Sequence, residues 1–258
     1  MRMVSCASSS LSCLILTHLV WFPITVANVF ALIAQPQDDS AGSALSQILA
    51  LVRRSDSIAV KSEGTRVLVN VIKSLWSSDS ASDDGAKAQK RRECMATVAN
   101  ASCAAALAQL VGRSKKYPIL INEGVVALSL LSTHASGGTL VLDAIMNPLP
   151  SEVIRPSQSQ PVSAIPTEGS PIAGPRTALD MLLSVLRNPD TMPAEVRSNV
   201  CALLGQLGRK GVVGENRAED VARIKTAAKE LLESLAADSE GNKQMASASA
   251  RRALDAWA

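Results

Sequence analysis

The chain has 258 residues, of which 47% are hydrophobic and only 2% aromatic, and its formal net charge is +3. This length supports one or two domains with a substantial core, and the interspersed charges argue against a nucleic-acid-binding protein, which would carry a basic stripe. Strand signals are nearly absent, because there is no sustained period-two alternation and no Asn-Gly or Asp-Gly hairpin between β-branched runs. The sequence therefore predicts an all-α fold.

Residues 1–37 differ in composition from the rest of the chain. They carry a single charge, Arg2, followed by an apolar run from Leu11 to Ala34. Three interpretations compete: a secretory signal peptide, a membrane anchor formed by residues 11–34, and a leading helix at Val26–Ala34 preceded by a non-native or poorly ordered leader. We favour the third, because the remaining residues have the features of a helical repeat from a reducing compartment.

The cysteines indicate whether the protein resides in a reducing or an oxidising compartment of the cell. They number five without close pairing, and Cys94, Cys103 and Cys201 each lie among Ala, Val or Leu. This pattern predicts buried free thiols rather than a disulfide framework. We therefore expect a cytoplasmic protein, with a membrane-anchored or secretory protein as the alternative if the N-terminal apolar segment acts as a targeting signal.

The stretch from Ser43 to Trp76 predicts two amphipathic helices joined by a short polar turn. Apolar residues recur at i, i+3, i+4 and i+7 in both halves. The same pattern returns twice, and the central leucine pairs 45/68, 107/128 and 179/203 lie 23, 21 and 24 residues apart. Three copies of one helical hairpin indicate a solenoid of stacked helices.

Caps and chain breaks place the other helices. Ser102 and Thr177 are the predicted N-caps of two helices, and Gly137-Gly138 is a predicted break before another. Ser77–Gly85 is a predicted acidic, serine-rich loop. The predicted helices outside the first hairpin are Lys87–Ala99, Cys103–Val111, Ile119–Ser132, Leu140–Met146, Ala178–Leu186, Ala194–Leu207, Ala218–Ala237 and Lys243–Trp257.

Residues 147–176 contain seven prolines among Ser, Gln and Gly, which predicts a disordered or polyproline-like insertion. Without its roughly 30 residues, the distance from Leu107 to Leu179 shrinks to about 42, the period of armadillo and HEAT repeats. We therefore divide the chain into an apolar leader, residues 1–37, and an armadillo-like helical repeat domain, residues 38–258, that contains the insertion.

Catalytic motifs are missing from the sequence. The two histidines, His18 and His134, have no Cys, Asp or Glu at metal-ligand spacing, and neither GxxxxGK[ST] nor GxSxG occurs. We therefore expect no catalytic residues, no metal site, no cofactor and no enzyme activity.

Three helices in 42–48 residues resemble the armadillo repeat. More specifically, DSIAVKSEGTRVLVNVIKSLW (56–76) and AAALAQLVGRSKKYPILINEGVVALSLLS (104–132) resemble the smg-GDS-type armadillo proteins, the small-GTPase GDP dissociation stimulators. The resemblance covers about 40–258, as a C-terminal portion of longer family members. It implies an armadillo-like α-α superhelix that binds a Rho- or Rap-type small GTPase. It also implies stimulated guanine-nucleotide exchange through a higher affinity for the nucleotide-free state, without catalytic groups.

The resemblance further implies a concave groove lined by the third helix of each repeat. Asn70 is the strongest candidate there, because an amide between Val69 and Val71 must find hydrogen-bond partners. For each candidate, the alternative is a solvated helix flank or a bond to a neighbouring turn. The alternative function is a non-catalytic armadillo scaffold, adaptor or chaperone-like protein. The predicted groove residues are Lys61, Arg66, Asn70, Lys73, Asn122, Glu123, Arg197, Asn199 and Gln206.

Overall fold

The structure is a computed structural model that describes residues 26–33, 43–55, 57–77, 85–150, 177–238 and 244–258. These residues form eleven α-helices and one short 3-10 helix. In the described ranges the sole β-type pairing is an isolated bridge between Pro148 and Thr177. The predicted all-α class is therefore confirmed. Most of the apolar leader, the acidic loop after residue 77 and most of the proline-rich insertion lie outside the described residues.

Most predicted helices are present within one or two residues of their expected bounds. The helix predicted at Val26–Ala34 is present as α2, where Val29, Phe30 and Ile33 are buried. The elements are α2 (Val26–Ile33), α3 (Ala44–Arg54), α4 (Ile58–Ser77), α5 (Gly85–Val98), α6 (Ala101–Arg113), α7 (Pro118–Ser132), α8 (Gly137–Met146), α9 (Ala178–Arg187), α10 (Ala194–Gly208), η2 (Glu215–Arg217), α11 (Ala218–Ala237) and α12 (Gln244–Trp257).

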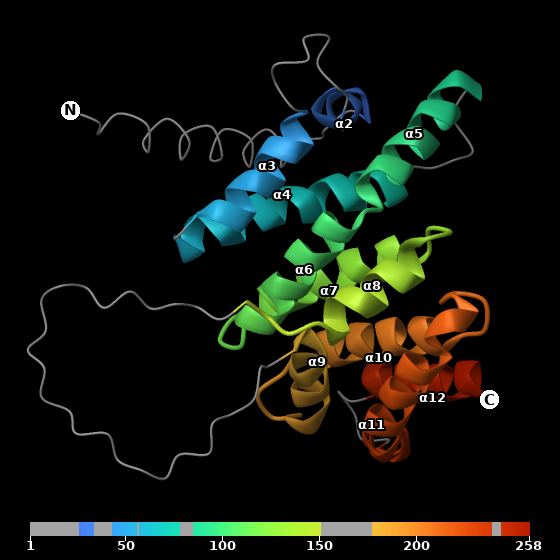
Figure 1. Cartoon of the computed structure of the whole chain (residues 1–258). Helices are drawn as coiled ribbons and strands as arrows, with labels where there is room; N and C mark the ends of the chain where they lie inside the picture. Colours follow the sequence, from blue (N-terminus) through green and yellow to red (C-terminus); the bar gives the residue numbers. More distant parts are fainter. Residues whose placement is uncertain (1–25, 34–42, 56, 78–84, 151–176, 239–243) are drawn as a thin grey trace, which may run out of the picture.

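The helices are stacked along the molecule in chain order, from α2–α5 at one end to α9–α12 at the other (Figure 1). Helix α3 packs on α4, and α6 packs on α7. Helix α4 in turn contacts α7, α7 contacts α10, and α10 contacts α12. The central leucines of the three repeated hairpins, Leu68, Leu128 and Leu203, are each no more than 1% exposed. Helices that share the same apolar pattern therefore lie side by side.

Two contacts define how α4 and α7 are aligned. Arg66 Nε lies 3.3 Å from Glu123 Oε2 in the first half of the two helices. Trp76 Nε1 donates a hydrogen bond to Thr133 Oγ1, at 2.9 Å, near their ends. Both contacts join residues 57 positions apart in the sequence. The two helices therefore run parallel with a constant register.

The two helices approach each other closely at the equivalent point in the α3–α4 hairpin and in the α6–α7 hairpin. A Cβ atom at Gly64 of α4 would lie 2.7 Å from Val52 of α3, and a Cβ at Gly124 of α7 would lie 2.7 Å from Val111 of α6. Each glycine precedes the central leucine of its helix by four residues. In both hairpins, a glycine at the equivalent position therefore allows the second helix to pack closely against a valine of the first.

Side-chain caps set the helix starts. Thr177 forms the predicted cap of α9, and with Asp180 it completes a capping box. The predicted cap at Ser102 is wrong. Asn100 caps α6 instead, because its side chain accepts a hydrogen bond from the backbone N–H of Cys103 at 2.9 Å. Ser102 therefore lies inside the first turn of the helix.

The predicted break at Gly137-Gly138 is also wrong, since both residues belong to the first turn of α8. A Cβ at Gly137 would meet the Leu131 carbonyl oxygen, and a Cβ at Gly138 would lie 2.1 Å from the carbonyl oxygen of Val212. These glycines therefore allow a close approach of α8 to the end of α7 and to the turn after α10. Their role is packing rather than termination.

We expect Gly138→Ala to lower the free energy of unfolding by about 1–2 kcal/mol. Overpacking against a fixed carbonyl costs about 1–3 kcal/mol, whereas the gain in helix propensity is at most about 1 kcal/mol. Gly85→Ala is the matched control, because nothing lies within 4 Å of its added methyl group. Urea unfolding followed by circular dichroism would measure both. Equal stability of the two variants would contradict the packing role.

Candidate partner-binding surface

Helices α4, α7 and α10 expose one shared face, here called the inner face. Its residues recur at three- or four-residue spacing, which keeps them on one side of each helix, and most are half-buried. Contacts between the helices show that the three stripes adjoin. The inner face consists of Glu63, Arg66, Asn70 and Lys73 from α4, Asn122, Glu123, Val126 and Ser129 from α7, and Glu195, Asn199, Ala202 and Gln206 from α10.

Four of the predicted groove residues contact one another across this face. Asn199 Nδ2 donates to Asn122 Oδ1 at 2.8 Å, and Asn122 Nδ2 donates to Glu195 Oε1 at 3.0 Å. Arg66 forms the ion pair with Glu123 described above and a second one with Glu63, at 3.2 Å. These polar links run from α4 through α7 to α10, so they hold neighbouring helices in position.

Glu63 and Glu195 belong to this polar network, but the sequence analysis did not single them out. Their signal was present in the sequence. Glu63 lies three residues before Arg66, and Glu195 lies four residues before Asn199, which are the spacings that place side chains on one helical face. The pairing of Asn199 with Asn122, 77 residues away, has no such local signal.

Three other predicted residues, Asn70, Lys73 and Gln206, are half-buried on the inner face. Within the part of the chain that the structure describes, none of their side chains makes a hydrogen bond or ion pair. Partly buried polar groups normally have partners in protein or water. These three side chains are therefore the inner-face groups that are free to bind another molecule.

The structure places the last two predicted residues away from the inner face. Lys61 precedes Glu63 by two residues, and Arg197 precedes Asn199 by two, so each points about 200° away around its helix. Lys61 borders a hollow beside Tyr117. Arg197 is only 3% exposed, and its Nε and Nη1 atoms make no hydrogen bond with any described residue.

The described cysteines are buried and free, as predicted. Burial removes water from the thiolate form and raises the pKa of Cys103 and of Cys201 to about 12. Burial also raises the pKa of Cys94. Because the thiolate is the reactive form, these cysteines are poor nucleophiles at neutral pH.

We therefore expect Cys103 and Cys201 to react slowly with iodoacetamide at pH 8 in the folded chain and rapidly in urea. The raised pKa keeps the thiols protonated at this pH, and burial blocks access to them. Peptide mass spectrometry would follow each cysteine separately. Rapid alkylation of either residue without denaturant would contradict this environment.

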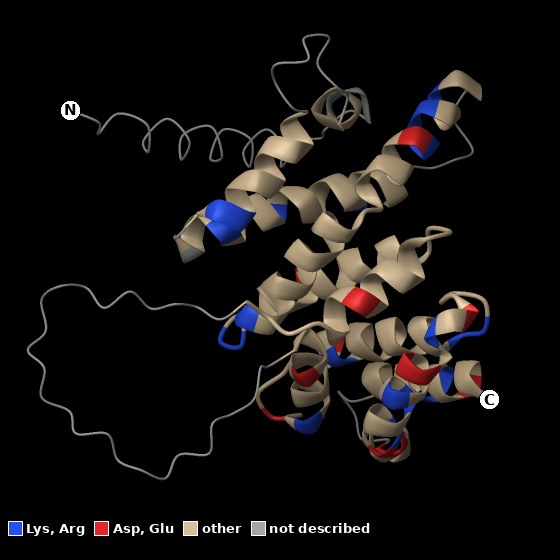
Figure 2. Ribbon diagram, viewed as in Figure 1, with Lys and Arg blue, Asp and Glu red and all other residues tan. Residues whose placement is uncertain are grey.

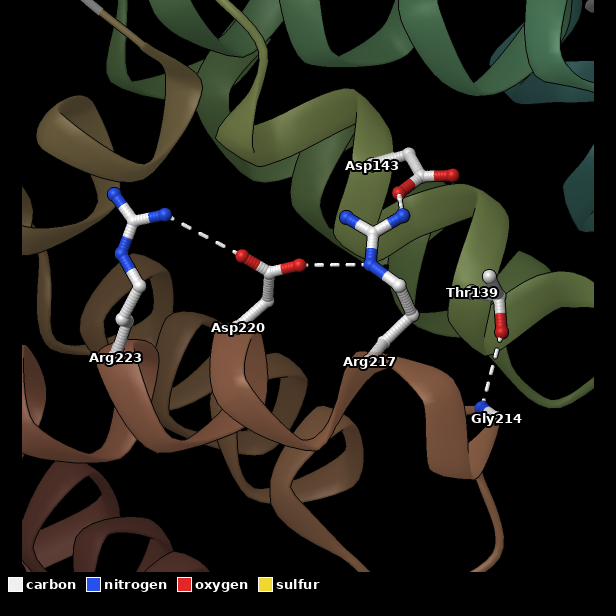
Figure 3. Close-up of polar contacts among 6 residues, drawn as sticks. All are labelled: Thr139, Asp143, Gly214, Arg217, Asp220 and Arg223. Carbon is white, nitrogen blue, oxygen red and sulfur yellow. Dashed lines mark hydrogen bonds and ion pairs between the residues drawn. The ribbon is translucent and has the colours of Figure 1, made fainter.

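Figure 3 shows a second polar cluster, which joins α8 to the start of α11. Arg217 forms ion pairs with Asp143 and, at 2.7 Å, with Asp220, whose other oxygen lies 3.4 Å from Arg223. The hydrogen bond with Asp220 raises the pKa of the Arg217 guanidinium above its usual value. A cation between two carboxylates satisfies both of them, so the cluster is a structural tie rather than a general acid–base pair.

Loss of this tie is testable with Arg217→Met. We expect a lower midpoint of urea unfolding, because Asp143 and Asp220 lose their shared cation and repel each other. The loss should shrink at high salt, since these groups are partly exposed. Arg223→Met is the matched control, because Arg223 is mostly exposed and makes only the longer contact. Equal midpoints for the two variants would refute the tie.

The described ranges hold no group of three or more His, Cys, Asp or Glu side chains arranged to bind a metal ion. Among the described helices, none alone has both the length and the apolarity to cross a membrane, and the bent pair α5 and α6 meets these criteria only when the two are joined.

Neither a family model nor a curated protein matches this sequence. Among solved structures, the chain is similar to the crystal structure of an engineered protein. The two share 16% sequence identity, the match covers 99% of this chain and 94% of the engineered one, and the TM-score is 0.47. At these values the likeness assigns neither a family nor an activity.

Proposed function

We propose that this chain is a non-catalytic, armadillo-like helical repeat protein that binds a partner protein through its inner face. The repeated hairpins, the parallel register of α4 and α7, and the common Gly–Val approach support a superhelical repeat. Such a repeat presents equivalent helices along one surface, which suits extended protein contacts. The buried free thiols support a cytoplasmic location.

The observation that carries this proposal is that the side chains of Asn70, Lys73 and Gln206 lack polar partners. These side chains are half-buried and have no polar partner among the described residues, while Arg66, Asn122, Glu123 and Asn199 on the same face are already paired. The paired residues hold the three helices in place, so less freedom is lost when a partner binds. The unpaired residues provide the hydrogen-bonding groups.

The narrower form of the proposal is a regulator of a Rho- or Rap-type small GTPase, supported by the sequence resemblance of 56–76 and 104–132. Exchange stimulation of this kind needs no general acid, base or metal. It requires that the inner face binds the nucleotide-free GTPase more tightly than the nucleotide-bound form, because only differential affinity shifts the equilibrium.

The second candidate is a scaffold, adaptor or chaperone-like protein that holds an extended peptide. The amide side chains of Asn70 and Gln206 on the inner face favour it. A side-chain amide both donates and accepts hydrogen bonds, as the backbone of an extended peptide requires, and Asn70 has no partner within the described residues. This function needs binding alone, without any effect on nucleotide release.

One assay separates the two candidates. The full chain would be mixed with Rho- and Rap-type GTPases that carry a fluorescent guanine nucleotide, and nucleotide release would be followed over time. We expect accelerated release for a GTPase regulator and binding without acceleration for a scaffold. Absence of binding to any GTPase tested would reject the narrower proposal.

The triple variant Asn70→Ala/Lys73→Ala/Gln206→Ala should weaken partner binding by about tenfold or more, since each lost hydrogen bond contributes about 1 kcal/mol. The control is Lys229→Ala/Glu233→Ala, which removes an exposed pair on α11. Isothermal titration would measure both affinities. If the control and the triple variant bind equally well, the inner face is not the binding surface.

A further inference from the structure

A groove runs between α3 and α6 and onto the start of α7, on the side of α4 that faces away from the inner face. It consists of two adjoining hollows of about 290 and 80 Å³, which share Val52, Ala106 and Gln109. Its floor is largely apolar, with Leu49 in the larger hollow and Leu120 in the smaller. We call it the outer groove.

The charge of the outer groove has one sign. Arg53, Lys61 and Arg113 line the two hollows, and among the described residues no carboxylate does. Lys115 and Lys116 are exposed on the adjacent turn between α6 and α7. Figure 2 shows basic segments, in blue, at the end of α3 and at the turn after α6. The lining therefore attracts negative charge.

Helix-end electrostatics explains only part of this charge. Arg53 and Arg113 lie in the last turns of α3 and α6, where a cation is favoured by the helix dipole. Lys61 lies in the first turn of α4, where the dipole disfavours a cation. Its ammonium group makes no ion pair or hydrogen bond with a described residue. Neither the helix dipole nor a contact with a described residue therefore explains why a cation stands at position 61.

Exposed apolar side chains adjoin the same groove. Tyr117, 63% exposed, lines the smaller hollow, and Ile119, 73% exposed, lies two residues further on. They are two of the three large hydrophobic residues that are exposed in the described ranges. Aromatic and apolar groups next to cations are typical of protein interaction sites.

We infer that the outer groove is a second docking site, which takes an acidic segment of a partner protein anchored by one or two hydrophobic side chains. The larger hollow is at the lower limit of the roughly 300–1,000 Å³ of small-molecule sites and the smaller one is well below it, so the two suit single side chains better than a cofactor. Carboxylates flanking the anchor would pair with Arg53 and Lys61, whereas Arg113 already donates a hydrogen bond to the Pro150 carbonyl and adds only to the positive potential. An apolar floor also favours a peptide over a nucleic acid, whose backbone needs a continuous track of cations.

The test uses the full chain and a short fluorescein-labelled peptide in which Asp and Glu alternate with Leu and Phe. We expect saturable binding by fluorescence anisotropy, and weaker binding as salt increases. Arg53→Glu/Lys61→Glu should weaken binding by about tenfold or more, because it replaces two attractions with repulsions. Ala105→Trp should also block binding, since its side chain would fill the larger hollow.

The control variant Arg187→Glu/Lys210→Glu makes the same charge change at exposed positions on α9 and after α10 and should keep the affinity. Circular dichroism melts would verify that each variant is folded. The proposal would be overturned if the peptide did not bind, or if the control variant lost as much affinity as Arg53→Glu/Lys61→Glu. It would also be overturned if a peptide with Lys in place of Asp and Glu bound equally well. Preferential binding of single-stranded RNA or of phosphatidylserine vesicles would overturn it as well. The inner face is not involved, so failure of the exchange assay would leave this result intact.

Discussion

The fold depends on the burial of aliphatic side chains between neighbouring parallel helices, above all around α7. Ile121, Leu128 and Leu131 of this helix are completely buried, and α7 contacts α4 on one side and α10 on the other. Because the chain has few aromatic residues, the core is filled by Leu, Val, Ile and Ala, and small residues allow the helix axes to approach closely. At about 25 cal/mol per Å² of apolar surface, this burial is the main force that holds the stack together.

Close approach is achieved by glycine at several of these contacts. Gly64 and Gly124 accommodate a valine from the partner helix of the hairpin, and Gly205 of α10 lies against the backbone of Ala253 in α12. A buried hydrogen bond between Ser198 and Ser249, at 2.7 Å, joins the same two helices. At the end of the chain, Trp257 closes the stack with a hydrogen bond to the Leu204 carbonyl at 3.2 Å. The contact between α10 and α12 thus combines close backbone approach with a few specific hydrogen bonds.

Helix α4 has a different role on each of its sides. One side carries Arg66 and Asn70 on the inner face, where paired side chains fix the helices and unpaired ones remain for a partner. The other side carries Lys61 and Thr65, which line the cationic outer groove. The two proposed surfaces share a helix but have different chemistry: the inner face is hydrogen-bonding and carries both signs of charge, whereas the outer groove is positive and apolar. A protein that binds two partners at once, or one partner through two segments, would have this arrangement.

The sequence alone determined the helices, because apolar spacing and caps are local. Spacing placed α7, α10 and α11 nearly to the residue and located α3 and α4 within one stretch, and Thr177 marked the start of α9. Only the tertiary structure decided which polar residues meet. Asn122 pairs with Asn199, and Lys61 and Arg197 turn away from the residues predicted beside them. It also showed that Gly137 and Gly138 are packing residues, because the carbonyls that exclude a side chain there come from other parts of the chain. Periodicity predicts the face of a helix, whereas the neighbour of that face is set by how whole helices pack.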